Sequence, residues 1–217
     1  MNICANIRWR LKRGGAPKRV KVGHGGTLDP LASGVLVILV GSCTRLCGEI
    51  MDGEKGYETT IDLSAFTDTD DAEGVRRKVD VPSPPTREAI EAILPRFTGT
   101  VMQTPPIYSA IHVDGQRAYD LARAGKPVEL KPRPVQIHEL RVLAYEWPTL
   151  TIAIRCGKGT YIRSLARDLG VALGTGGTLA ALRRTRVGRF VIEEARTMAS
   201  LPEAMTQNDL LAQEVEQ

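Results

Sequence analysis

An eight-residue apolar segment bounded by glycines, "GVLVILVG" from Gly34 to Gly41, places the strongest constraint on the fold. It is rich in β-branched residues and too short for a core helix of ordinary length, so it predicts a buried β-strand. A membrane span needs about 20 apolar residues, and no other apolar run approaches that length. We therefore expect a globular chain with this strand in its core.

Other segments carry the periodicity of helices or strands. We expect helices in "NICANIRWRLKRGG" (2–15, with Ile3, Cys4, Ile7 and Leu11 on the buried face), "SPPTREAIEAILPRFTG" (83–99) and "GTYIRSLARDLGVALG" (159–174, with Ile162, Leu165, Leu169 and Leu173 inward), and strands in "YETTIDLSAF" (57–66) and "LTIAIRC" (150–156). Strands recur between helices without the regular unit of a doubly wound parallel sheet. The predicted fold class is therefore α+β (mixed α/β), with a central, largely antiparallel sheet and flanking helices.

The segment from Thr104 to Pro134 is irregular and rich in proline. It predicts an insertion that stands off the core and holds one short helix ending at Gly125. We find no repeat, low-complexity tract or clear linker elsewhere. The expected organisation is one domain over residues 1–200, followed by a short C-terminal tail over 201–217.

The distribution of charge is more informative than its total. The chain has 29 Lys and Arg residues against 25 Asp and Glu residues, a net charge of +4 that only weakly favours an anionic partner. The cations are concentrated in two places: Arg8, Arg10, Lys12, Arg13, Lys18, Arg19 and Lys21, ahead of the first acidic residue, and Arg183, Arg184, Arg186 and Arg189. Either cluster is a solvated face or a surface that binds phosphates.

No sequence pattern indicates a metal or nucleotide site. The four cysteines, Cys4, Cys43, Cys47 and Cys156, lack paired metal spacing, and we expect them to be reduced and mostly buried. "GKGT" at Gly157 lacks the other elements of a phosphate-binding P-loop. "DTDDAEG", which begins at Asp68, lacks the ligand spacing of an EF-hand. We interpret it as a solvated turn in which Asp side chains cap backbone N–H groups.

Asp29 lies in the glycine-rich loop "GHGGTLDP" directly before the apolar segment. Pro30 favours extended backbone at Asp29, and the preceding glycines permit the close approach of another backbone or of a ligand. The alternative is an Asp-Pro turn whose side chain bonds its own loop. His24, taken alone, is equally compatible with a structural role.

The segment "GHGGTLDPLASGVLVILVG" (23–41) resembles the signature of the TruB family of tRNA pseudouridine synthases. The resemblance continues in "EKGYETTIDLSAFTDTDDAEG", "PPIYSAIHVDGQRAY" and "RCGKGTYIRSLARDLG…LRRTRVGRF", which follow in the family's order over nearly the whole chain. It implies the pseudouridine synthase fold and an enzyme that breaks the C1′–N1 bond of a uridine, turns the uracil and rejoins it through C5. No cofactor or metal is implied.

Three catalytic residues follow from the resemblance. Asp29 matches the catalytic aspartate, a nucleophile that attacks C1′ or otherwise assists glycosidic cleavage. Tyr57 matches the tyrosine that stacks on the target base and is suited to removing the C5 proton; otherwise it is a strand aromatic in the core. Arg163 matches the arginine that pairs with the aspartate and keeps it ionised; without the family it would be an ordinary helix-surface residue.

The resemblance also implies residues and surfaces that bind the substrate. Tyr161 and Leu182 match residues that shape the uracil pocket, although either could be plain core, and His24 matches the histidine near the extruded nucleotide. The nucleotide must be flipped out of its stack, at a cost of about a few kcal/mol. The basic clusters would hold phosphates of the tRNA T-arm, and the 104–134 insertion resembles the family's RNA-clasping thumb.

The chain departs from the family pattern in three places. The first strand and the Lys-Pro-Gly-type segment that normally precede the first helix are absent, "GGTL" at Gly176 replaces the usual Gly-Ala-His-Leu, and the C-terminal tail is too short for the additional RNA-binding (PUA) domain. The leading expectation is a cytoplasmic, monomeric tRNA pseudouridine-55 synthase with no membrane or protein partner. The alternatives are a catalytically weak RNA-binding or RNA-folding protein, and a dyskerin-type relative that depends on a guide RNA.

Overall fold

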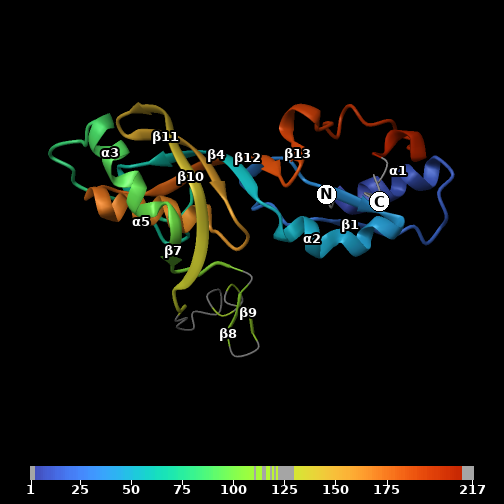
Figure 1. The fold of residues 1–217 in the computed structure, drawn as a ribbon, viewed down its shortest axis with the longest axis horizontal. Helices are drawn as coiled ribbons and strands as arrows, with labels where there is room; N and C mark the ends of the chain where they lie inside the picture. Colours follow the sequence, from blue (N-terminus) through green and yellow to red (C-terminus); the bar gives the residue numbers. More distant parts are fainter. Residues whose placement is uncertain are drawn as a thin grey trace. The chain divides into compact units, whose positions relative to one another are not determined.

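The structure, a computed structural model, describes residues 3–109, 111–113, 116–117, 119, 121 and 130–211. The chain forms two compact units (Figure 1). Unit 1 consists of residues 1–53 and 185–217, and unit 2 of residues 54–184. The division falls within strand β12 (Thr178–Val187). Unit 1 therefore joins the two ends of the sequence.

The helix predicted at the start of the chain is confirmed as α1 (Ile3–Arg13). Its inner face buries Ile7 and Leu11 in a cluster with Val22 and Met205. Ile3, which we predicted on the same face, is the first residue of the helix and is 39% exposed. The helix is followed by Gly14 and Gly15. Gly15 has φ 95°, as expected for a glycine that ends a helix.

The strand predicted over residues 34–41 is buried but not continuous. It is divided into β2 (Ala32–Gly34) and β3 (Ile38–Val40), and β3 pairs antiparallel with β1 (Val22–His24). Gly34 has φ 105°, outside the extended region, so the two strands cannot be one. Every second residue from Val35 is buried. Val35 and Val37, between the two strands, and Leu39, in β3, form one cluster with Val187. A 3₁₀ turn, η1 (Gly41–Leu46), and helix α2 (Cys47–Asp52) follow.

The main sheet has the strand order β13-β12-β4-β11-β10-β7. The strands along this path are β4 (Lys55–Asp62), β7 (Gly99–Gln103), β10 (Arg133–Glu146), β11 (Thr149–Cys156), β12 and β13 (Phe190–Val191), and β2 pairs with β12 beside the path. The neighbours β4/β11, β11/β10, β10/β7 and β12/β13 are antiparallel, which confirms the predicted fold class. The strand predicted at 150–156 corresponds to β11, in which Leu150, Ile152, Ile154 and Cys156 are buried in alternation.

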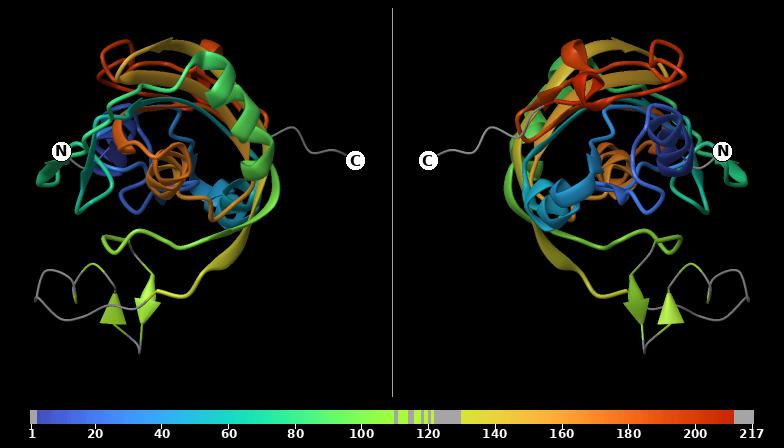
Figure 2. Two further views of the ribbon diagram at one scale, coloured as in Figure 1. Left: turned by 90° about the vertical axis from the view of Figure 1, so that its left-hand side faces the viewer. Right: turned by 90° about the vertical axis from the view of Figure 1, so that its right-hand side faces the viewer.

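Two of the predicted helices cover the sheet of unit 2. Helix α5 (Ile162–Leu173) buries Ile162, Leu165 and Leu169 and lies within the arc of the curved sheet (Figure 2). Helix α3 (Arg87–Ile93) and the 3₁₀ turn η2 (Leu94–Phe97) lie against β10. The Thr86 hydroxyl caps α3 by accepting a hydrogen bond from the Ala89 amide.

The strand predicted over 57–66 ends earlier than expected. β4 stops at Asp62, whose carboxylate accepts hydrogen bonds from the Ser64 amide (2.8 Å) and hydroxyl (2.6 Å). This side-chain turn redirects the chain into β5 (Ala65–Thr67), which pairs with β6 (Arg76–Lys78).

The remaining elements are short. β8 (His112–Val113) and β9 (Gln116–Arg117) form a small antiparallel ladder, and η3 (Ile192–Glu194) and η4 (Gln207–Asp209) follow β13. The short helix predicted to end at Gly125 lies outside the described residues. Within the described ranges, no helix has the length and apolar character needed to cross a membrane.

The four cysteines are free, as predicted. Only Cys156 is buried, and the other three are half-buried, so the expectation of mostly buried thiols was wrong. Cys43 and Cys47 pack at the edge of the cluster around Val35 and Val187 rather than within it. Burial raises the pKa of the Cys156 thiol to about 11.

Candidate active site

The six predicted site residues fall in the two separate units. His24 and Asp29 belong to unit 1, and Tyr57, Tyr161, Arg163 and Leu182 belong to unit 2. Within each unit the local geometry is defined. The predicted ion pair involves Asp29 of unit 1 and Arg163 of unit 2, and it stays a prediction.

The loop that carries Asp29 is shaped by close packing. The Gly25 amide donates to the Val37 carbonyl (2.9 Å), which extends the β1–β3 pairing by one bond. A Cβ atom on Gly25 would collide with the Ile50 side chain of α2, and the next residue, Gly26, has φ 105°. The Asp29 carbonyl then accepts from the Ala32 amide (2.9 Å), and the Asp29 side chain is half-buried. The glycines are therefore required by the path of the loop.

His24 is the last residue of β1. Its carbonyl accepts a hydrogen bond from Cys47 Sγ (3.3 Å), which ties the strand to α2. Its ring atom Nδ1 is buried and has no hydrogen-bond partner among the residues that the structure describes. Buried polar atoms are normally satisfied, so an unsatisfied ring nitrogen beside the Asp29 loop is suited to bind a ligand.

Tyr161 is held by a buried glutamine. It is the N-cap residue of α5; its amide donates to Gln103 Oε1 (2.8 Å) and its carbonyl accepts from Gln103 Nε2 (3.1 Å). Gln103 is 2% exposed, and the Arg133 guanidinium lies 5.6 Å from the centre of the Tyr161 ring. Sequence reasoning missed Gln103, because nothing in the sequence links β7 to the start of α5.

Tyr57 and Leu182 lie on neighbouring strands of the sheet. Tyr57 is half-buried on β4, opposite Ile154 of β11, and Leu182 is buried on β12. Their burial is consistent with either role that the sequence left open, a pocket wall or part of the core.

Arg163 is buried in the first turn of α5 and is not an ordinary surface residue. Its Nη1 atom pairs with Asp71 Oδ2 (3.3 Å), and its Nη2 atom donates to the Tyr108 carbonyl (3.1 Å). A third contact, from Nη1 to the Thr69 carbonyl, measures 3.4 Å. The guanidinium is thus fixed by the acidic turn at 67–74 and by the first residues of the 104–134 segment.

The acidic turn at 67–74 is only partly as predicted. Its Asp side chains do cap backbone amides, with Asp71 Oδ1 accepting from the Glu73 amide (3.1 Å) and Asp68 Oδ1 from the Val75 amide (2.8 Å). The turn is only partly solvated, however: Asp68 and Glu73 are exposed, but Asp70 and Asp71 are buried against α5. No sequence pattern links these carboxylates to Arg163 and Arg167, which lie 92 and 97 residues further along the chain.

A second ion pair lies one turn further along α5. Arg167 Nη1 contacts Asp70 Oδ2 (2.7 Å), and Asp70 has the left-handed φ of 61°. Burial raises the pKa of Asp70, and the Arg167 charge opposes this shift. Arg167 Nη2 (3.0 Å) and Ser164 Oγ (2.8 Å) both donate to the Thr104 carbonyl. Helix α5 therefore anchors the start of the 104–134 segment through its side chains.

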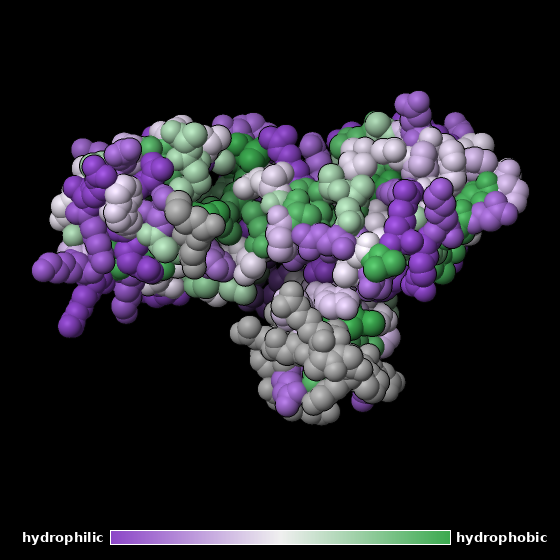
Figure 3. All heavy atoms as spheres, turned by 180° about the vertical axis from the view of Figure 1, so that it is seen from behind, coloured by the Kyte–Doolittle hydropathy of each residue, from purple (hydrophilic) through white to green (hydrophobic). Residues whose placement is uncertain are grey.

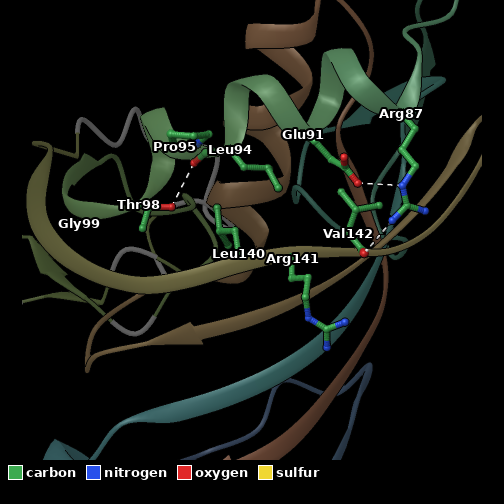
Figure 4. A pocket seen from close by; sticks show the side chains of 9 residues that line it. All are labelled: Arg87, Glu91, Leu94, Pro95, Thr98, Gly99, Leu140, Arg141 and Val142. Atoms are coloured by element: carbon green, nitrogen blue, oxygen red, sulfur yellow. Dashed lines mark hydrogen bonds and ion pairs between the residues drawn. The ribbon is translucent and has the colours of Figure 1, made fainter.

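A shallow groove between α3 with η2 and β10 is also present in unit 2 (Figure 4). Arg87 pairs with Glu91 (2.8 Å) and donates to the Val142 carbonyl (3.1 Å) at one end of it. None of the six predicted residues is among those that line the groove. Across the part of the chain that the structure describes, no cluster of three or more His, Cys, Asp or Glu residues is arranged to hold a metal ion.

Comparison of the sequence with known families places these residues in context. The model of the TruB family pseudouridylate synthase N-terminal domain matches residues 13–162, and the model of the tRNA pseudouridylate synthase B C-terminal domain matches residues 163–216. The chain belongs to the TruB family. Its Asp29 loop, Tyr57 and Tyr161 lie within the first match, and Arg163 and Leu182 within the second.

Curated relatives of this TruB-family chain carry the name tRNA pseudouridine synthase B. The protein from Bradyrhizobium diazoefficiens is 54% identical over 78% of this chain and 49% of its own length. The protein from Phocaeicola vulgatus is 44% identical over 96% of this chain and 88% of its own length. The chain thus spans about half the length of the first relative and most of the second.

A solved structure, described as a Cbf5-Nop10-Gar1 complex, contains a similar fold. The TM-score is 0.61 at 30% identity, covering 85% of this chain and 45% of that one. A second, an H/ACA RNP bound to a substrate RNA containing 2′-deoxyuridine, matches with a TM-score of 0.58 at 27% identity, over 85% of this chain and 43% of that one. Both likenesses confirm the predicted pseudouridine synthase fold.

Proposed function

We propose that this chain is a tRNA pseudouridine synthase that isomerises uridine 55 in the T-arm of tRNA. The observation that carries the proposal is its 44% identity, over 96% of the chain, to a curated relative named tRNA pseudouridine synthase B. The loop geometry at Asp29 and the fixed guanidinium of Arg163 agree with such an enzyme.

The reaction is an isomerisation, so no atom is gained or lost overall. The C1′–N1 bond breaks, the uracil turns, and a C1′–C5 bond forms. The proton on C5 leaves and N1 is protonated in the product. Because nothing is oxidised or reduced and a carboxylate can serve as the nucleophile, the proposed chemistry needs no metal or redox cofactor.

Asp29 is the proposed catalytic nucleophile and Arg163 its electrostatic partner. Asp71 and the Tyr108 carbonyl hold the Arg163 guanidinium in one orientation, so little reorganisation is needed when Arg163 meets a carboxylate. Arg163 would keep Asp29 ionised and oriented toward the sugar. Tyr57 would stack on the uracil and accept the C5 proton, directly or through water.

The remaining predicted residues would hold the flipped nucleotide. Tyr161, locked by Gln103, and Leu182 would line the uracil pocket, and His24 would occupy space beside the extruded uridine and hydrogen-bond to it through Nδ1. Stacking and filling of this kind offset the unstacking cost of about a few kcal/mol. The 104–134 segment would grip the T-arm as an RNA-clasping thumb.

We further propose that the protein acts in the cytoplasm, as a monomer and without a protein partner. The test of the proposed function is tritium release from tRNA labelled at uridine C5, followed by mapping of the product. Release from position 55 by the protein alone supports the proposal. Release only when a guide RNA is added would instead support a dyskerin-type activity, and tRNA binding without release would support an RNA-binding protein.

A further inference from the structure

Gln103 and Arg133 face each other at the end of two neighbouring strands in unit 2. Gln103 is the last residue of β7 and Arg133 the first residue of β10, and the two are partners in the antiparallel register. Residues directly opposite each other in an antiparallel pair project their side chains on the same face of the sheet. The next residues of β10 on this face, Val135 and Ile137, are buried. The side chains of Gln103 and Arg133 therefore project together toward the interior of the unit.

Gln103 occupies a position that an apolar residue would ordinarily fill. Hydrophilic residues are spread widely over the molecular surface on the face shown in Figure 3, but Gln103 is 2% exposed. Its neighbour Met102, on the opposite face of β7, is 61% exposed. A buried amide needs hydrogen-bond partners, and both polar atoms of the Gln103 side chain are bonded to the backbone of Tyr161. The position of Gln103 is thus explained by its contact with Tyr161.

The two bonds from Gln103 fix the place where helix α5 begins. Tyr161 is the N-cap residue, and its own side chain makes no capping hydrogen bond. Its carbonyl accepts from the Leu165 amide (3.1 Å), which is the first bond of the helix, and from Gln103 Nε2 as well. Arg163 follows two residues later, in the first turn. Because successive residues of a helix keep a fixed rise and rotation, a shift of its start would displace Arg163 together with Tyr161.

Arg133 contacts the other part of Tyr161, its ring. The guanidinium carbon lies 5.6 Å from the ring centre, within the range of a cation–π contact. The Nε atom of this half-buried arginine is itself buried and has no hydrogen-bond partner among the residues that the structure describes. A buried donor normally has an acceptor, and a cation–π contact is strongest where water is excluded. The ring of Tyr161 therefore takes the place of a polar partner for Arg133.

We propose that Gln103 and Arg133 are positioning residues that hold Tyr161 in the orientation that the uracil requires, Gln103 through the Tyr161 backbone and Arg133 through its ring. The inference rests on the proposed function, in which Tyr161 lines the uracil pocket. Both residues act through Tyr161, and Gln103 also acts on Arg163 through the first turn of α5. A misplacement of about 1 Å in an active site can cost about 100-fold in rate, so the effect falls on the isomerisation and not on RNA binding.

The test is single-turnover tritium release from a C5-labelled T-arm stem-loop RNA by the full chain at saturating concentration, with the Kd for the same RNA measured separately. The variants Gln103→Met and Arg133→Met keep an unbranched side chain and remove its polar group. We expect each variant to lower the single-turnover rate by about 10- to 100-fold while the Kd changes by less than about twofold. Arg133→Lys, which keeps a positive charge beside the ring, should retain part of the rate that Arg133→Met loses.

A double-mutant cycle with Tyr161→Leu separates positioning from a general loss of stability. Without the ring, Arg133→Met should have little further effect on the rate, because the group through which Arg133 acts is absent. An equal fold-loss with and without the ring would overturn the inference. Should Gln103→Met fail to fold, this cycle still decides the question, since Arg133 is only half-buried.

The matched control is Tyr145→Phe, which removes the hydrogen bond from the Tyr145 hydroxyl to the Pro85 carbonyl (2.6 Å) near the other end of β10. This variant should release tritium at the wild-type rate. An equal loss in the control would show that any lost hydrogen bond of unit 2 slows the reaction, and it would overturn the inference. Wild-type rates in both Gln103→Met and Arg133→Met would overturn the inference alone. No release by the wild-type chain would contradict the proposed function, and the inference would fail with it.

Discussion

The cations of α5 and those of the loop before β1 carry the same charge in opposite surroundings. Arg163 is buried and Arg167 is half-buried, and each pairs with an Asp of the acidic turn. Lys18, Arg19 and Lys21 are exposed and, within the described residues, form no ion pair. The two sets of cations therefore differ in burial. Those on α5 form ion pairs within the protein, and those on the loop before β1 are exposed to solvent.

The largest expected effect is the loss of the buried ion pair in Arg163→Met. This change leaves Asp71 buried without its cation, which costs about 3–5 kcal/mol of unfolding free energy. Urea denaturation of the wild type and the variant measures the difference. If the cost is instead below about 1 kcal/mol, Asp71 is well solvated in the protein and the contrast with the surface cations fails.

The double variant Arg163→Met/Asp71→Asn separates the charge from the packing. If the cost of Arg163→Met comes from an uncompensated carboxylate, replacing Asp71 by an amide should recover a substantial part of it. No recovery would mean that the lost packing of the Arg163 side chain dominates.

An intermediate effect is expected from pH at Asp70. Because burial raises its pKa above 3.8, the folded state holds this proton more tightly than the unfolded chain does, so ionisation of Asp70 opposes folding. Its contribution to stability is greatest below pH 3.8, falls as pH rises through the raised pKa, and is constant above it. The unfolding free energy of the wild type minus that of Asp70→Asn should therefore decrease with pH across this window. A difference that increases with pH would show that Arg167 outweighs burial.

The smallest effect is expected for the exposed pair between Arg76 and Asp62. Arg76 is half exposed, with 51% of its side chain accessible, although the two charged groups are 2.7 Å apart. Solvent screens such pairs, so Arg76→Ala should cost about 0–1 kcal/mol in the same urea experiment. A loss as large as that of Arg163→Met would show that distance, and not burial, ranks the ion pairs of this protein.

The hydrophobic periodicity of the sequence predicted those helices and strands in which the spacing of apolar residues marks the buried face. Helices α1 and α5 and strand β11 were identified because a repeat of 3.6 or 2 residues marks the face that enters the core. Periodicity missed the break at Gly34, because a positive φ in an apolar run leaves no mark in the hydrophobic pattern. It also misjudged the acidic turn, whose burial depends on α5 far away in the sequence.

The predicted site residues came from the family resemblance. The resemblance did not predict the residues that hold two of them in place. Asp71 and Gln103 were missed because each acts through a partner in another element, Arg163 and Tyr161 respectively. Polar residues of this kind look like ordinary turn or strand residues until the fold brings the elements together.

The central claim is that Asp29 is the nucleophile of a pseudouridine synthase. Its most direct test is single-turnover tritium release from C5-labelled tRNA, comparing the wild type with Asp29→Asn and with Asp80→Asn, which removes an exposed carboxylate of unit 2. We predict a loss of about 10³-fold or more for Asp29→Asn, with tRNA affinity retained and Asp80→Asn fully active. Release by Asp29→Asn at a rate close to that of the wild type would contradict the assignment.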